Sequence, residues 1–245
     1  RMSASGPASH ATPGGSRPED DAAAVQRPRA APDPQPAPEL GALEGAAREI
    51  FGDRLELARR YTEHLASSGI VRGLIGPREA PRLWERHVLN CAVVQELIAP
   101  DARVVDVGSG AGLPGLCLAI ARPDLSITLV EPLERRVTWL EEVVADLGLE
   151  NVRVLRARAE QAKAELGPVD VVTARAVSAL VGLVDITLPL LKGRGELLAL
   201  KGRTAEEELQ KASKKLKRFG VRSSEVLTVG ADVLAEPTTV VRLVL

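Results

Sequence analysis

Several residue types are scarce in this 245-residue chain. Aromatic residues make up 2% of it, and it contains two cysteines and three histidines. Because Cys91 and Cys117 both lie in apolar, helix-like patterns, we expect core thiols and no disulfide framework. The histidines are scattered, so no cluster has the ligand spacing of a metal site. No apolar run reaches the roughly 18 residues that a membrane-spanning helix needs.

The same absences bound the location and the partners of the protein. Residues 1–40 lack the apolar core of a signal peptide, so we expect a soluble, cytoplasmic protein. We expect a monomer, with neither a metal nor a membrane among its partners.

Charge is nearly balanced, at a net −1 from 32 basic and 33 acidic residues, so no global field attracts nucleic acid. A local excess of basic residues occurs at 192–222, where ten lysines and arginines stand against four glutamates. Lys214 and Lys215 lie in the C-terminal half of a predicted helix there and are candidates for RNA binding. Glutamates early and lysines late in a helix also suit the helix dipole, so a purely structural interpretation stays open.

The chain divides into three parts by composition. Residues 1–40 hold many alanines and eight of the 17 prolines, which predicts a disordered tail. In residues 41–100 apolar residues recur every three or four positions, which predicts an N-terminal helical cap. Glycines and prolines near 69–81 interrupt it. Residues 101–245 alternate strand and helix patterns, as an α/β domain does.

Seven strands are expected in the α/β part. The connections between the first five are long enough for helices, among them 113–121, 133–147 closed by Gly148, and a short helix at 159–166. Thr204 to Glu207 matches a capping box for a further helix. The last two strands lack a helix-length connection and should pair antiparallel. The expected strands are 103–108, 126–131, 152–157, 169–173, 196–200, 224–229 and 238–245.

A glycine loop at 108–115 follows the first strand and precedes a helix, the place where such sheets bind ligands. Its Gly110-x-Gly112-x-x-Gly115 spacing matches the dinucleotide fingerprint, which alone is weak evidence. Asp106 would repel a pyrophosphate but suits the positive sulfonium and ammonium groups of S-adenosylmethionine. Glu131, which ends the second strand, can accept hydrogen bonds from ribose hydroxyls, and this fits NAD equally. We therefore favour a methyltransferase over an NAD-linked oxidoreductase.

Further segments carry a specific resemblance. They are Glu85-Arg86-His87, the 106–115 loop with its Gly-Leu-Pro-Gly end, Arg158-Ala159-Glu160, Ala174-Arg175-Ala176 and Leu200-Lys201-Gly202. From about residue 47 to 245 the chain resembles the ribosomal RNA small subunit methyltransferase G family, also called glucose-inhibited division protein B. The resemblance implies a Rossmann-like, seven-strand S-adenosylmethionine-dependent fold with a helical cap.

The resemblance also implies a reaction and a cofactor site. Family members methylate N7 of a guanine, position 527, in the 530 loop of 16S rRNA. The residues carried over by position as S-adenosylmethionine contacts are Gly108, Leu113, Ala159, Glu160 and Arg175; from the residues themselves we add Asp106, Gly110 and Glu131. Ala159, after the third strand, leaves room for a backbone amide to meet the adenine edge.

The expected chemistry needs no general base, because guanine N7 has a free lone pair. Catalysis would be mainly positioning. Arg175 and Arg158 are candidates for donating to guanine O6, since donation to N7 would block attack. Lys201 could hold a phosphate, and Arg86 and His87 belong to a basic segment that could contact RNA. Each of these side chains could instead serve only in internal ion pairs or as a solvated surface residue.

Three other functions stay open at this point. They are an NAD-linked oxidoreductase, a small-molecule methyltransferase whose helical cap is a pocket lid, and a non-catalytic ribosome-assembly factor. Intact Asp106, Glu131 and glycines argue against the last of these. The expected partner is 16S rRNA or the small ribosomal subunit.

Overall fold

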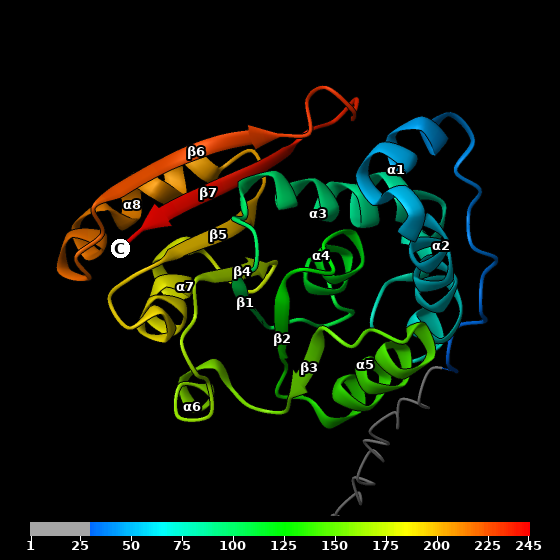
Figure 1. Ribbon diagram of the computed structural model, residues 1–245, viewed down its shortest axis with the longest axis horizontal. Coiled ribbons are helices and arrows are strands. Elements are labelled where there is room, and N and C mark those ends of the chain that lie inside the picture. Colours follow the sequence, from blue (N-terminus) through cyan, green and yellow to red (C-terminus); the bar gives the residue numbers. More distant parts are fainter. Residues whose placement is uncertain (1–29) are drawn as a thin grey trace, which may run out of the picture. The chain divides into compact units, whose positions relative to one another are not determined.

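The computed structural model describes residues 30–245. Most of the tail expected at 1–40 therefore lies outside the described residues. Residues 31–245 form a single compact unit in which helices cover both faces of one sheet (Figure 1). No helix of residues 30–245 is long and apolar enough to cross a membrane, and no group of three or more His, Cys, Asp or Glu there could hold a metal.

The sheet has seven strands in the order β3-β2-β1-β4-β5-β7-β6. The first five in sequence are parallel, whereas β7 runs antiparallel to both β5 and β6. The predicted antiparallel pairing of the last two strands is thus confirmed. The strands are β1 (Arg103–Val107), β2 (Ser126–Val130), β3 (Val152–Leu155), β4 (Val171–Arg175), β5 (Glu196–Lys201), β6 (Ser223–Val229) and β7 (Thr238–Val244).

Strand β1 lies in the middle of the parallel part, paired with β2 and β4. Successive side chains of a strand point to opposite faces. Val104 accordingly packs in the core on one face, whereas Val105 and Val107 pack in the core on the other. Asp106, on the same side of the strand as Val104, is paired in register with Leu129 of β2 and Thr173 of β4. The carboxyl ends of β1, β2 and β4 therefore meet at one edge of the sheet.

The helices of the α/β part follow the strands in the expected places. They are α4 (Gly115–Ala121), α5 (Glu134–Leu147), α6 (Ala159–Ala162), α7 (Leu180–Thr187) and α8 (Ala205–Arg218). Helix α5 ends at Gly148, whose φ of 63° is the left-handed conformation predicted for this C-cap. Helix α6 is a single turn and stops well before residue 166, the expected end.

The predicted capping box of α8 is wrong. Thr204 has φ −90° and ψ 9°, not the extended backbone of an N-cap, and its side chain makes no capping bond. Its hydroxyl instead lies 3.2 Å from Glu208 Oε1. Glu208 also accepts a hydrogen bond from Leu180 N at 2.7 Å, so α8 begins with a link to α7 rather than with its own cap.

A helical layer precedes the sheet in the chain and packs against α4 and α5, on the face of the sheet that these helices cover (Figure 1). It contains α1 (Glu44–Phe51), α2 (Leu55–His64) and the short α3 (Asn90–Ala92), joined by 3-10 and π-helical turns. Two buried aromatic side chains fasten the layer. Tyr61 donates to Ala111 O at 2.6 Å, and Trp139 of α5 donates to Ser68 Oγ at 2.8 Å. The layer is thereby attached directly to the loop that follows β1.

The residues just before α1 also contact this layer. Leu40 is buried, Gln35 N donates to Ala66 O at 3.0 Å, and Trp84 Nε1 donates to Pro38 O at 2.9 Å. The composition predicts a tail over residues 1–40, but residues 35–40 pack with the helical layer. The buried Trp84 serves this packing.

Candidate active site

The loop between β1 and α4 reverses the chain by means of three glycines in the left-handed region. Gly108, Gly110 and Gly112 have φ values of 66°, 55° and 84°. A side chain is unfavourable at such angles, which explains the glycine at each position. Leu113, the next predicted site residue, is buried where the loop enters α4.

Asp106 ties the two ends of this loop together. It is fully buried, and its Oδ2 accepts from Gly115 N at 3.1 Å while Oδ1 accepts from Thr173 Oγ1 at 2.9 Å. Burial in a poorly solvating environment disfavours the charged form and raises the pKa of Asp106 to about 6. The carboxyl group therefore holds the start of α4 against β1 and β4.

Gly115 offers a test of how tightly this loop is packed. A Cβ at this position would lie 2.3 Å from Leu129 Cδ2 and 2.7 Å from Asp106 Oδ2. We expect Gly115→Ala to destabilise the protein by about 3 kcal/mol, the upper end for overpacked sites, in urea unfolding. The matched control is Gly45→Ala in α1, where nothing lies within 4 Å. It should be neutral or stabilising by up to about 1 kcal/mol, and equal losses in both variants would contradict the packing argument.

Glu131, directly after β2, holds the loop from the other side. It is 1% exposed, and its two oxygens accept from Gly110 N and Leu133 N, both at 3.0 Å. Arg136 Nη1 lies 3.8 Å from Oε2. A carboxylate has about four acceptor sites, so two remain for ligand hydroxyls.

The surroundings of Glu131 suit a nucleoside such as that of S-adenosylmethionine. Arg136 Nε is buried without a hydrogen-bond partner in the described part of the chain, which leaves a donor for a ligand atom. Leu133 is 45% exposed beside the carboxylate and offers apolar surface to a flat base. Beyond the neighbouring strand, Ala159 is buried at the start of α6, whereas Arg158 and Glu160 are exposed. The role of Ala159 beside an adenine stays a prediction.

A second cluster gathers around Arg175, at the end of β4. Its Nη2 donates to His87 Nδ1 at 2.7 Å, and its Nη1 lies 3.6 Å from Cys91 Sγ. No ion pair joins Arg175 to Asp106, Glu131 or Glu160, the internal partners considered from the sequence, all of which are described residues. The arginine is therefore held by the helical layer and not by the carboxylates of the glycine loop.

The chain bends sharply after Arg175. Ala176 has a φ of 52°, an unfavourable value for a residue with a side chain and one that tends to occur at functional sites. The following Val177 approaches Gly108 so closely that a Cβ there would lie 2.9 Å from it. The segment after β4 thus lies against the glycine loop.

Lys201, at the end of β5, fixes the same segment. Its ammonium donates to Ser178 O at 2.6 Å and pairs with Glu208 Oε2 at 3.0 Å, with 11% of its side chain exposed. These contacts use most of the donor capacity of the lysine inside the protein. Its predicted role in holding a phosphate stays a prediction.

A cavity of about 790 Å³ opens between the ends of β4 and β5 and the helical layer. It collects four of the predicted site residues, Arg86, His87, Arg175 and Lys201, and adds Arg203 and three glutamates, Glu79, Glu85 and Glu236. Arg158, at the end of β3, does not line it, and neither do Lys214 and Lys215. The residues proposed from the sequence to contact RNA or the guanine therefore fall into two groups, one that lines the cavity and one that does not.

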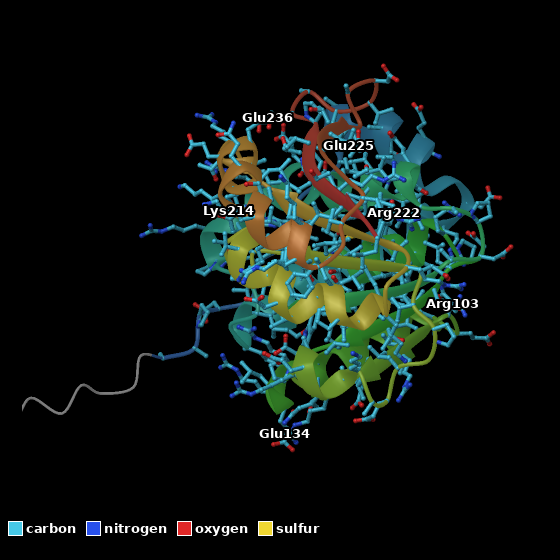
Figure 2. The ribbon with its side chains drawn as sticks, turned by 90° about the vertical axis from the view of Figure 1, so that its left-hand side faces the viewer. Arg103, Glu134, Lys214, Arg222, Glu225 and Glu236 are labelled. Carbon is cyan, nitrogen blue, oxygen red and sulfur yellow. The ribbon has the colours of Figure 1, made fainter. Side chains whose placement is uncertain are left out.

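The two lysines of α8 differ from each other. Lys215 pairs with Asp185 at 2.7 Å and donates to Val181 O at 2.8 Å, so it fastens α8 to α7. Lys214 is exposed at the surface of α8 (Figure 2). Of the two, Lys214 is the freer to meet an RNA phosphate.

Sequence reasoning missed Thr173 and Glu79. Thr173 could have been found by aligning the parallel strands, since its position in β4 is level with Asp106 in β1. No sequence pattern marks Glu79, because its contact with His87 forms only when the helical layer folds over the end of β4. It accepts a hydrogen bond from His87 Nε2 at 2.7 Å.

The strand order, the antiparallel β7 and the carboxylate-flanked glycine loop define the class, a Rossmann-like S-adenosylmethionine-dependent methyltransferase. A solved structure of this kind, a SAM-dependent methyltransferase from Aquifex aeolicus, superposes with a TM-score of 0.52 at 21% identity, over 70% of this chain and 97% of that one. This similarity shows the fold.

Sequence similarity is more specific. Residues 54–235 match the family model described as rRNA small subunit methyltransferase G. Relatives named ribosomal RNA small subunit methyltransferase G are 67% identical in Renibacterium salmoninarum, over 82% of this chain and 94% of the relative, and 66% identical in Pseudarthrobacter chlorophenolicus, over 81% and 92%. The chain belongs to the rRNA small subunit methyltransferase G family, as its motifs predicted.

Proposed function

We propose that this protein transfers a methyl group from S-adenosylmethionine to N7 of a guanine in the 530 loop of 16S rRNA, position 527. The observation that carries the proposal is the 790 Å³ cavity at the ends of β4 and β5. Its size is in the range of ligand pockets, large enough for a nucleotide. Arg175 lines this cavity, and the segment that follows it approaches Gly108 of the glycine loop through Val177.

The proposed reaction needs no general base, although three glutamates line the cavity. Both ring nitrogens of His87 are engaged within the protein, so this histidine is not available to remove a proton from a substrate. Guanine N7 carries no proton, and its lone pair is the nucleophile. The remaining task is to orient the base, and in the proposal the Arg175 guanidinium, which lines the cavity, donates to guanine O6.

The cofactor supplies an electrophilic methyl group on a positively charged sulfur. In the proposal, Asp106 and the turn at Gly108, Gly110 and Leu113 hold its amino-acid part, and Glu131 binds the ribose hydroxyls. Ala159 and Glu160 lie beside the adenine. An ionised carboxylate at Asp106 would attract the positive charges of the cofactor.

The RNA would be held by local positive charge. Arg86 and Arg203 are exposed and line the cavity, and Lys214 extends the basic surface over α8. Arg158, exposed at the end of β3, would meet RNA beside the adenine site. We further propose that the protein acts in the cytoplasm, where a ribosomal substrate is found, and that it acts as a monomer.

The proposal is tested by mapping N7-methylguanosine in 16S rRNA from cells with and without the gene. Chemical cleavage at N7-methylguanosine followed by primer extension should lose one signal, at the 530-loop guanine, in the deleted strain. The purified protein should restore it on rRNA or on small subunits from that strain, and comparing the two identifies the true substrate. An unchanged map after deletion would refute the substrate assignment.

A further inference from the structure

Arg175 is the last residue of β4, yet its strongest contact is with the helical layer. Its Nη2 lies 2.7 Å from His87 Nδ1, and His87 Nε2 lies 2.7 Å from Glu79 Oε2. The three side chains form an unbroken row from Glu79, which lies between α2 and α3 in the helical layer, to the carboxyl end of β4. Arg175 and His87 line the cavity, as does Glu79.

The donors and acceptors of the three side chains determine which ring nitrogen of His87 carries the proton. A guanidinium has donors only, so His87 Nδ1 must accept from Arg175. Nδ1 therefore carries no hydrogen, and Nε2 carries the ring proton that is donated to Glu79. The imidazole is neutral, with 12% of its side chain exposed. Adding a second proton at Nδ1 would remove the acceptor and place two positive groups in contact.

We propose that Glu79 and His87 are positioning residues, which hold the Arg175 guanidinium at the angle needed to meet guanine O6. The inference rests on the proposed function, since the O6 contact is part of it. It differs from the RNA contact predicted for His87 from the sequence, because both ring nitrogens already have protein partners. The helical layer thereby becomes part of the active site without touching the reacting atoms.

The charges around His87 favour its neutral form. Burial lowers its pKa, the carboxylate of Glu79 raises it, and the positive charges of Arg175 and Arg86 lower it, so that the pKa lies below the usual value. The hydrogen bond from His87 in turn lowers the pKa of Glu79. The cavity brings further charges to this side of the ring, from Lys201, Arg203, Glu85 and Glu236.

The arrangement can be measured without any substrate. In ¹⁵N NMR of the full chain, one of the three histidines should titrate below its usual pKa and carry its neutral proton on Nε2; His87→Asn removes that signal and so assigns it. Glu79→Gln should lower the His87 pKa further, because it removes the carboxylate that stabilises the protonated ring. A proton on Nδ1, or a pKa unaffected by Glu79→Gln, would overturn the proposed row.

The functional test compares two replacements of His87. Asn places Oδ1 close to the position of Nδ1 and keeps an acceptor for Arg175, whereas Ala removes it. We expect His87→Ala to lower kcat by about 10- to 100-fold, the usual cost of a misplaced group, with S-adenosylmethionine affinity unchanged. His87→Asn should retain most of the activity and lose the decline in kcat that accompanies His87 protonation at low pH.

Failure of this inference is distinguishable from failure of the proposed function. If the wild-type protein methylates rRNA but His87→Ala is fully active, or a folded His87→Asn is as impaired as His87→Ala, the positioning role is refuted. If His87→Ala does not fold, the pH dependence of kcat in His87→Asn is the deciding measurement. If kcat of this variant still declines at low pH as fully as in the wild type, the positioning role of His87 is refuted. If wild-type protein transfers no methyl group to rRNA while the NMR results hold, the proposed function fails and the row stands as a structural link.

Discussion

Replacing Asp106 with asparagine is expected to make the protein more stable at pH 8. The pKa of Asp106 is raised from 3.8 to about 6, so its stabilising contribution is complete below about pH 4 and is lost as the pH rises through 6. At pH 8 the buried ionised form costs about 3 kcal/mol, at roughly 1.4 kcal/mol per pKa unit. Asn avoids this cost.

The net gain should be smaller than this cost. An Asn oxygen can still accept from Gly115 N, but its amide nitrogen faces Thr173 Oγ1, whose hydroxyl hydrogen must find another acceptor. That rearrangement costs about 1 kcal/mol, which leaves a gain of about 1–2 kcal/mol at pH 8. Urea unfolding at pH 4 and pH 8 measures it. The variant should show no advantage at pH 4, and an equal advantage at both pH values would contradict the assigned pKa.

The same substitution should weaken S-adenosylmethionine binding. Losing a hydrogen-bonded charge opposite the cationic cofactor costs about 10- to 100-fold in affinity. In the wild-type protein the affinity should rise as the pH increases through 6 and Asp106 ionises, whereas in Asp106→Asn this dependence disappears. S-adenosylhomocysteine, which lacks the sulfonium charge, is the control ligand and should lose less. Calorimetry that finds equal affinities for the variant and the wild type would remove Asp106 from the cofactor site.

The strands and the glycine loop were predictable because their signals are local. Val104, Val105 and Val107 make a buried strand recognisable in any context, and the glycines mark the positions where positive φ is needed. The predicted length of α6 is too great, because the spacing of apolar residues alone does not determine where a helix ends. The capping box failed because Thr204 lacks the extended backbone of an N-cap and its hydroxyl contacts Glu208, whose carboxylate also accepts from Leu180 N of α7.

The structure brings four of the candidate residues, Arg86, His87, Arg175 and Lys201, to one cavity, but the sequence does not predict how they contact one another. Asp106 and Glu131 were chosen for their chemistry toward a cofactor, and the structure shows that both also accept backbone hydrogen bonds from the loop. The pairing of His87 with Arg175 joins residues 88 positions apart in the chain. Such contacts are created by packing the helical layer on the sheet, and no pattern of residue types encodes them.

Arg175→Ala is expected to have the largest effect on turnover. If its guanidinium donates to guanine O6, its removal should lower kcat by about 100-fold or more, the cost of losing one preorganised donor. Arg175→Lys should lose nearly as much, because an ammonium lacks the planar fork that meets His87 and the base together. Single-turnover methyl transfer to rRNA at saturating cofactor measures this loss.

Two control variants show whether a loss of turnover in Arg175→Ala is specific to this arginine. Arg194→Ala removes an exposed arginine near the amino end of β5, away from the cavity, and should leave activity unchanged. Arg158→Ala tests the other predicted O6 donor and, since Arg158 does not line the cavity, should cost less than Arg175→Ala. The family resemblance also placed Arg175 at the cofactor. Should Arg175→Ala weaken S-adenosylmethionine binding by the same factor as turnover, the arginine would act through the cofactor, and its assignment to the guanine would be refuted.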